Sequence, residues 1–325
     1  MDEGSESSPA PGSPAPDFSA AVQPSYVRTV FLGPAGLRAG WGLAFYVAMF
    51  YPLQFVAGRW VGSAALGVNG LWGLMLDEFG VLVAAVLPAL ILGRVERRPW
   101  GAYGLPGRLA FGKLFWAGAV WGFASITLLL GTIYGLRVFD FGRLAIHGAR
   151  ILKYGVFWAA MFLLVGFFEE FLLRGYSQFT LTRAIGFWPS AVVLSCMFGL
   201  IHLQNAGEQW TGVLAAAVIG FFFCLTLRRT RSLWFAVGFH AAWDWGETFL
   251  YSVPDSGTIF PGHLLKSSFH GPRWLTGGMV GPEGSLLCFV VIGVVWVGFV
   301  RVYKDVKHGA GQEKSLTQGS QRFTG

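Results

Sequence analysis

The stretch VGFFEEFLLRG, residues 165–175, decides the fold class of this chain. It places Glu169 and Glu170 side by side in an apolar run, and Arg174 follows Glu170 by one helical turn. One ionised side chain at the centre of a membrane helix costs about 2.5–3.5 kcal/mol on insertion scales, so adjacent carboxylates there need partners or a function. The rest of the chain must therefore supply polar groups that share a cavity with them.

The composition is typical of a membrane protein. The chain has 325 residues, of which 54% are hydrophobic, 13% are charged and 46 are glycine. Charged residues make up about a quarter of a typical soluble domain and glycine about 7%, so both values point away from water. Apolar runs near the ~20 residues that span a bilayer recur along the chain. We expect an all-α, polytopic transmembrane helical bundle with a cavity inside it.

The apolar runs predict about eight membrane spans within residues 37–303. Residues 1–36 are rich in Pro, Ser and Ala, so we expect a disordered tail, and residues 304–325 form a basic polar tail. The predicted spans are 40–57, 71–92, 114–136, 155–173, 188–202, 211–227, 233–251 and 285–303.

The charge of +7 is concentrated in short connectors, which indicates membrane orientation and no nucleic-acid partner. The basic connectors 93–113 and 228–231 and the C-terminal tail alternate correctly if both termini are cytoplasmic. The basic connector 137–154 is the exception, since it would face outward unless part of it is an interfacial helix.

Two later spans carry histidines and carboxylates at helical spacing. The motif FGLIH places Phe198 and His202 four positions apart. The motif FHAAWDWGE places His240, Asp244 and Glu247 at i, i+4 and i+7, along one face of a helix.

Each of these features also has a purely structural explanation. Glu170 and Arg174 have the i, i+4 spacing of a helical ion pair. A single histidine in a span is often a hydrogen-bonded packing residue. Asp77 and Glu78 lie near the start of a span, so we expect them to be solvated.

A carboxylate and two imidazoles from three helices can together activate a water molecule. They can do so as ligands of a metal with an open position, as in zinc hydrolases, or directly as general base and acid. The residues alone leave a hydrolase, a proton-coupled transporter and an ion pathway open, because all three place carboxylates and histidines in the membrane.

The three motifs, in this order, resemble the CPBP family of intramembrane proteases. That family includes the CAAX prenyl endopeptidases and the bacterial Abi proteins linked to bacteriocin self-immunity. The motifs stand here as EEFLLR from Glu169 to Arg174, FGLIH ending at His202, and HAAWD from His240 to Asp244, within about residues 155–250.

The resemblance implies an endopeptidase that cleaves a membrane-associated peptide or protein in the lipid bilayer. It implies that Glu169 and His202 activate the attacking water and that His240 and Asp244 stabilise the oxyanion. It also implies a multi-pass protein of the bacterial cytoplasmic membrane. The alternative is a non-proteolytic immunity or scaffolding protein of the same family.

Four further residues would support such a site: Glu170, Arg174, Phe198 and Glu247. Glu170 and Arg174 would hold the helices around the cavity together.

Members of the family have been described both as metalloproteases and as glutamate-dependent proteases. A zinc or other divalent ion would be held by Glu169, His202 and His240, although we favour a site without a tightly held zinc.

Asp244 departs from the asparagine that the family's prenyl proteases carry at this position. An amide can donate a hydrogen bond to an oxyanion, whereas an ionised carboxylate only accepts. We expect Asp244 to orient His240, as carboxylates beside imidazoles commonly do.

The predicted spans leave one conflict in depth. Glu169 lies near the end of span 155–173, while His202 closes span 188–202 at the opposite side of the membrane. A short or tilted span 188–202 would bring the two residues together.

Overall fold

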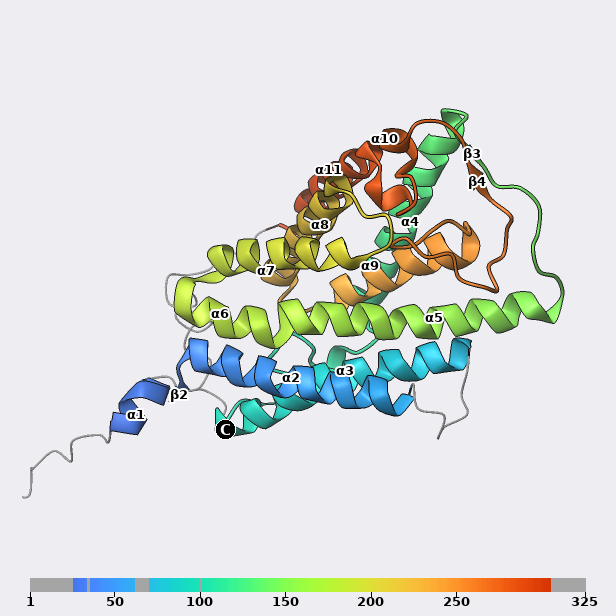
Figure 1. The fold of residues 1–325 in the computed structure, drawn as a ribbon. Coiled ribbons are helices and arrows are strands. Elements are labelled where there is room, and N and C mark those ends of the chain that lie inside the picture. Colours follow the sequence, from blue (N-terminus) through green and yellow to red (C-terminus); the bar gives the residue numbers. More distant parts are fainter. Residues whose placement is uncertain (1–25, 34–35, 62–69, 100, 305–325) are drawn as a thin grey trace, which may run out of the picture.

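The computed structural model describes residues 26–33, 36–61, 70–99 and 101–304, and it confirms a helical bundle (Figure 1). The helices are α1 (Tyr26–Phe31), α2 (Ala39–Val61), α3 (Leu71–Val95), α4 (Lys113–Gly135), α5 (Ala149–Glu170), α6 (Gln178–Ile185), α7 (Phe187–Ile201), α8 (Trp210–Thr230), α9 (Trp234–Trp245), α10 (Arg273–Thr276) and α11 (Leu286–Val302). Two π-helical turns, η2 (Phe171–Ser177) and η4 (Gly246–Leu250), extend α5 and α9.

All eight predicted spans are helical, although two are shorter than expected. Among the described residues, six helical runs are long and apolar enough to cross a membrane: Ala39–Arg59, Leu71–Val95, Lys113–Gly135, Ala149–Ile185, Phe187–Gln204 and Trp210–Thr230. The other two predicted spans correspond to α9 with η4 and to α11, which has 17 residues. The protein is therefore a polytopic helical bundle, as its composition predicts.

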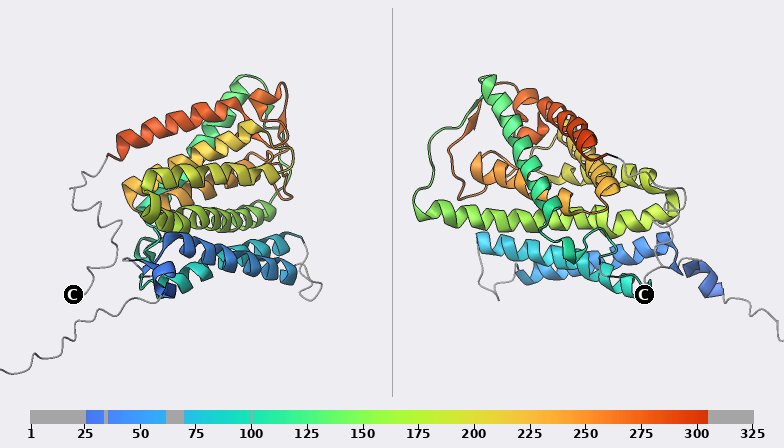
Figure 2. Two further views of the ribbon diagram at one scale, coloured as in Figure 1. Left: turned by 60° about the vertical axis from the view of Figure 1, so that its left-hand side comes forward. Right: turned by 180° about the vertical axis from the view of Figure 1, so that it is seen from behind.

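The helices form a layered arrangement in which α5 lies in the middle. In Figure 1, α2 and α3 lie below α5, and α7, α8, α9 and α11 lie above it. Helix α1 and the C-terminal end of α11 lie at the same end of the bundle (Figure 2). That both termini face the cytoplasm stays a prediction.

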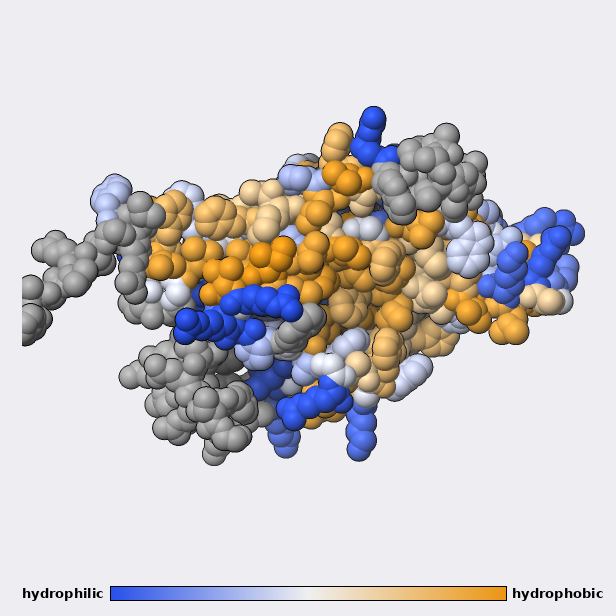
Figure 3. Space-filling view, turned by 90° about the horizontal axis from the view of Figure 1, so that it is seen from below, coloured by the Kyte–Doolittle hydropathy of each residue, from blue (hydrophilic) through white to orange (hydrophobic). Residues whose placement is uncertain are grey.

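The face formed by α2 and α3 is largely apolar. In Figure 3 hydrophobic residues form a broad region across this face, and hydrophilic residues gather mainly at its periphery. Tyr51, Phe55 and Trp72 are at least 60% exposed there. In water such a surface would associate or aggregate, so its natural solvent is lipid.

Helices α4 and α9 pack unusually closely because glycines line their contact. A Cβ atom at Gly118 or Gly122 would collide with the carbonyl oxygens of Phe235 or Phe239, and one at Gly238 would collide with that of Phe115. The small-residue pattern of α4 therefore marks a real helix contact. This contact fixes the residues that precede His240.

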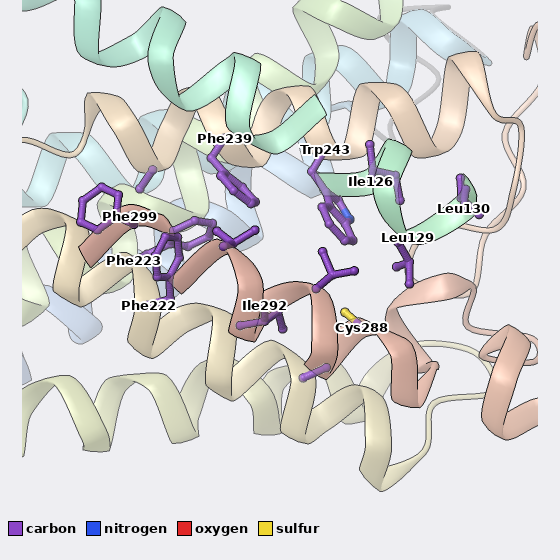
Figure 4. Close-up of a cluster of buried hydrophobic side chains, with 14 of the residues drawn as sticks. Ile126, Leu129, Leu130, Phe222, Phe223, Phe239, Trp243, Cys288, Ile292 and Phe299 are labelled. Carbon is purple, nitrogen blue, oxygen red and sulfur yellow. The ribbon is translucent and has the colours of Figure 1, made fainter. Parts of the chain in front are cut away.

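The largest buried apolar cluster joins α4, α8, α9 and α11. Figure 4 shows Phe239 and Trp243 of α9 pointing toward Ile292 and Cys288 of α11. These side chains also form the apolar wall of a cavity.

The connectors at the end of the bundle opposite α1 pair with one another. Strand β3 (Phe139–Asp140) is antiparallel to β4 (Ser268–Phe269), and Leu144 and Leu265 form an isolated bridge. The basic connector thus runs as extended chain before α5 begins at Ala149, and it forms no interfacial helix before that residue.

The predicted N-terminal tail falls partly outside the described residues, which begin at Tyr26. Its last part forms α1 and an antiparallel pair of β1 (Leu32–Gly33) and β2 (Gly36–Leu37). Of the predicted C-terminal tail, only Lys304 is described.

Candidate active site

The glutamate pair lies in the middle of a long helical run. Because η2 joins α5 to α6, the run extends from Ala149 to Ile185 and does not end near residue 173. Gly186, with a φ of 84°, then turns the chain back into α7. Glu169 precedes Gly186 by 17 residues and His202 follows it by 16, and both residues line one cavity. The two residues therefore lie at similar depth, which resolves the conflict between the predicted spans.

His240 is surrounded by carboxylates on both sides of its ring. Its Nε2 lies 3.6 Å from Glu169 Oε2 and 3.6 Å from Asp244 Oδ2. Its Nδ1 lies 3.3 Å from Glu170 Oε1. A doubly protonated imidazole can donate toward both sides at once, so this surrounding suits the cationic ring.

Glu170 joins Arg174 to His240. Glu170 Oε1 lies 3.2 Å from Arg174 Nη1, and both side chains are fully buried. The Arg174 guanidinium also stacks 4.4 Å from the centre of the Phe198 ring. Glu170 is therefore more than the ion-pair partner of Arg174, because it also fixes the imidazole of α9.

The arginine fits only because a neighbouring residue has no side chain. A Cβ atom at Gly220 of α8 would collide with Arg174 Nη2. The glycine at this position of α8 thus leaves the space that the guanidinium occupies.

His202 has one defined tautomer. It occupies the first position of the 3₁₀ turn η3 (His202–Gln204), and its Nδ1 lies 2.7 Å from the carbonyl oxygen of Phe198. Because a carbonyl only accepts, Nδ1 must carry the hydrogen. In the neutral ring, Nε2 is then left as an acceptor. The neutral His202 ring can therefore accept a hydrogen bond from a water molecule through Nε2, whereas a doubly protonated His240 ring can only donate one.

One cavity of about 370 Å³ brings the predicted catalytic residues together. Its polar wall includes Glu169, His202, His240 and Asp244, which come from α5, η3 and α9. Glu169 is 26% exposed at the side chain, whereas its Oε2 is buried and accepts no hydrogen bond. Within the described residues, Glu169 and His202 share the cavity without a direct hydrogen bond.

Glu78 also lines this cavity, and the expectation that it is solvated is wrong. Its Oε1 is buried without a hydrogen-bond partner, whereas Asp77 is exposed. Because α3 begins at Leu71, Glu78 lies two turns inside the helix. The sequence does not show which of these two adjacent acidic residues is buried, because both lie near a span boundary.

Glu247 does not line the cavity, although its spacing predicts the same helix face as His240. The π-helical turn η4 begins at Gly246 and changes the direction of the side chains that follow. Oxygens of Glu247, Asp255 and Glu283 lie within 4.8 Å of one another, and we call these residues the connector cluster. Burial, together with the neighbouring Glu283 carboxylate, raises the pKa of Asp255 to about 7.

The proposed metal ligands Glu169, His202 and His240 do not converge. The only group of three or more His, Cys, Asp or Glu ligand atoms within 4.8 Å in the described parts of the chain is the connector cluster. A zinc site needs its ligands about 2.0–2.3 Å from one ion. This arrangement does not fit a zinc held by those three residues.

The fold and the cavity define an integral membrane protein with a carboxylate–histidine site inside its helical bundle. Residues 152–246 match the family model described as Type II CAAX prenyl endopeptidase Rce1-like, and this match confirms the resemblance to the CPBP proteases. The match covers less than a third of the chain, and it includes all three motifs. No curated protein and no solved structure matches significantly.

Proposed function

We propose that this protein is an intramembrane endopeptidase in which Glu169 and His202 activate the attacking water. The observation that carries the proposal is that Glu169, His202, His240 and Asp244 line one cavity although they come from separate helical segments. The matched family is a family of proteases, which supports hydrolysis of a peptide bond over transport.

Glu169 is suited to the role of general base. It is partly exposed to the cavity, and among the described residues no arginine forms an ion pair with it as Arg174 does with Glu170. In the proposed step, the water oxygen attacks the scissile carbonyl carbon while its proton moves to the Glu169 carboxylate. The free Nε2 of His202 accepts the second hydrogen of the water and orients it.

His240 is suited to stabilise the oxyanion that this attack creates. Its Nε2 faces Glu169 and Asp244 at 3.6 Å, which leaves room for a substrate oxygen to compete for the hydrogen. Donors that are fixed before the reaction stabilise such charge most effectively. Glu169 would then return its proton to the amine nitrogen as the C–N bond breaks.

Asp244 acts through His240 in this mechanism. Its carboxylate lies beside the imidazole Nε2 and is 6% exposed at the side chain. A negative charge at this position favours the protonated ring. The role of Asp244 is therefore to orient His240 and to stabilise its positive charge.

The substrate is expected to combine an accessible peptide bond with an apolar segment. Part of the cavity wall is apolar and includes Phe239, Trp243 and Ile292. The name of the matched family points to prenylated CAAX peptides as one substrate class to test. We further propose that the protein lies in a bacterial cytoplasmic membrane with cytoplasmic termini, since the basic connectors alternate accordingly.

The proposal is tested by comparing wild-type protein with Glu169→Gln in proteoliposomes. Both are incubated with solubilised membrane proteins and, separately, with a farnesylated CAAX peptide, and new termini are identified by mass spectrometry. We expect cleavage by wild type and retention of the uncleaved substrate by the variant. Equal cleavage by wild type, Glu169→Ala and His202→Ala would exclude the mechanism and favour a non-proteolytic scaffolding role.

A further inference from the structure

The connector cluster brings three carboxylates together at the end of the bundle opposite α1. Glu247 comes from η4, Asp255 from the chain that follows it, and Glu283 from the 3₁₀ turn η5 (Pro282–Gly284) just before α11. One oxygen from each lies within 4.8 Å of the other two. Buried like charges at such distances repel one another strongly unless something neutralises them.

The described side chains that contact the cluster do not neutralise it, and the one cation that acts on Asp255 and Glu283 is the His240 imidazole in the same cavity. Thr248 Oγ1 donates to Asp255 Oδ2 at 2.8 Å, and Ser256 Oγ donates to Glu283 Oε2 at 3.3 Å. These donors are neutral hydroxyls, and no lysine or arginine forms an ion pair with the cluster in the described part of the chain.

Glu247 is the strongest indication that the cluster binds a ligand. Its side chain is completely buried, and neither carboxylate oxygen has a hydrogen-bond partner among the described residues. A buried carboxylate without any donor is costly, so native proteins supply a partner or an ion. Its ligand oxygen is aimed at those of Asp255 and Glu283.

The backbone beside Glu247 is shaped to admit this carboxylate. Gly281 has a φ of 113°, and a Cβ atom there would lie 3.3 Å from Glu247 Oε1 and collide with the carbonyl oxygen of Pro254. A glycine thus lets the Glu247 carboxylate and the Pro254 carbonyl oxygen approach the same point of the chain.

The donor chemistry selects the class of ion. Carboxylate oxygens without histidine or cysteine are preferred by hard cations such as Ca²⁺ and Mg²⁺. Calcium–oxygen distances of about 2.3–2.6 Å allow two ligand oxygens to lie up to roughly 5 Å apart. Magnesium needs a near-ideal octahedron and gives up its water reluctantly, whereas calcium accepts carboxylates in flexible geometry, so three protein carboxylates from irregular segments suit calcium better.

We propose that Glu247, Asp255 and Glu283 bind a calcium ion that fastens the connector between α9 and α11 to the end of α9. The same connector supplies Asp255 and Ser256 to the cavity wall, and α9 also carries His240. The ion would therefore hold one wall of the cavity in a fixed position relative to the histidine.

Calcium binding is measured on full-length protein in detergent, after treatment with a chelator, by isothermal titration with CaCl₂ or MgCl₂. We expect one saturable site that prefers calcium, and roughly tenfold or weaker binding in Glu247→Gln. Asp140→Asn is the matched control, because it removes an exposed carboxylate from the paired connectors and leaves the cluster intact. Its calcium affinity should equal that of wild type.

Thermal unfolding gives a second measurement that needs no substrate. Calcium should raise the melting temperature of wild type and Asp140→Asn, and it should leave that of Glu247→Gln unchanged. Where Glu247→Gln does not fold, Asp255→Asn and Glu283→Gln replace it. Absence of saturable binding to wild type, equal affinity in the cluster variants, or binding of magnesium alone would overturn the proposal. Neither measurement depends on proteolysis.

Discussion

The intramembrane site around His240 and the connector cluster both bury several carboxylates, but only the first contains cationic partners. Glu170 lies beside Arg174 and His240, and Glu169 lies beside His240. In the connector cluster, the hydroxyl groups of Thr248 and Ser256 donate hydrogen bonds to Asp255 and Glu283. The comparison teaches that burial alone does not say what a carboxylate is for. The charge beside it distinguishes the intramembrane carboxylates, which lie beside cations of the chain, from the connector cluster, for which we propose a bound ion.

The largest expected effect is on catalysis by Glu169. Glu169→Gln keeps the shape of the side chain and removes the base, so the rate of substrate cleavage should fall by about 10²–10⁴-fold. The rate is measured in proteoliposomes on a substrate identified by trapping. Asp140→Asn, which changes charge far from the cavity, should cleave at the wild-type rate. A loss of less than about tenfold in Glu169→Gln would mean that Glu169 is not the base.

The next prediction tests whether Glu170 and Arg174 neutralise each other's charge in the intramembrane site. Arg174→Met leaves Glu170 buried without its guanidinium and should lower the stability by about 3–5 kcal/mol. The double variant Glu170→Gln with Arg174→Met should be more stable than Arg174→Met alone, because no charge is left unpaired. Unfolding of purified protein in detergent measures both. Additive losses would contradict an interaction between the two residues.

A smaller effect is expected from Asp244. Asp244→Asn preserves size but removes the charge beside His240, so cleavage should fall by about tenfold at neutral pH. Its optimum should move to lower pH, where His240 is protonated without help from a carboxylate. Unchanged activity with an unchanged pH profile would show that the carboxylate has no distinct role.

The smallest expected effect is on the melting temperature, and its sign depends on whether calcium is bound. In the presence of a chelator, Glu283→Gln relieves repulsion in the connector cluster and should raise the melting temperature by roughly 1–3 °C. With saturating calcium the same variant should melt below wild type, because a ligand is lost. A shift of the same sign in both conditions would mean that the cluster is held by protons or by packing.

The helices and the intramembrane site could largely be predicted from the sequence. Apolar periodicity located all eight helical stretches, and three motifs identified the residues that share the cavity. Hydropathy placed the end of the span near residue 173 because polar residues from Arg174 onward interrupt the apolar run. The helix continues there through η2, since Arg174 is buried against Glu170 and Phe198.

The connector cluster could not be predicted in the same way. Glu247 has the correct spacing for the His240 face only if the helix stays regular, and η4 changes that spacing. Asp255 lies outside any helix and Glu283 lies in the single 3₁₀ turn η5, where no periodicity indicates which residues meet. Glu78 was missed for a related reason, because a helix boundary uncertain by a few residues decides whether an acid is buried or solvated.

The two arms of the hairpin, from Glu169 to Gly186 and from Gly186 to His202, contain nearly equal numbers of residues. This limits how the length of the chain can change during evolution. One residue inserted between Gly186 and His202 would move the imidazole by about 1.5 Å along the helix and by about 100° around it. A single insertion or deletion in either arm therefore dismantles the site. Length changes can survive only as compensating pairs, so this hairpin should be the segment of the protein whose length varies least among its relatives.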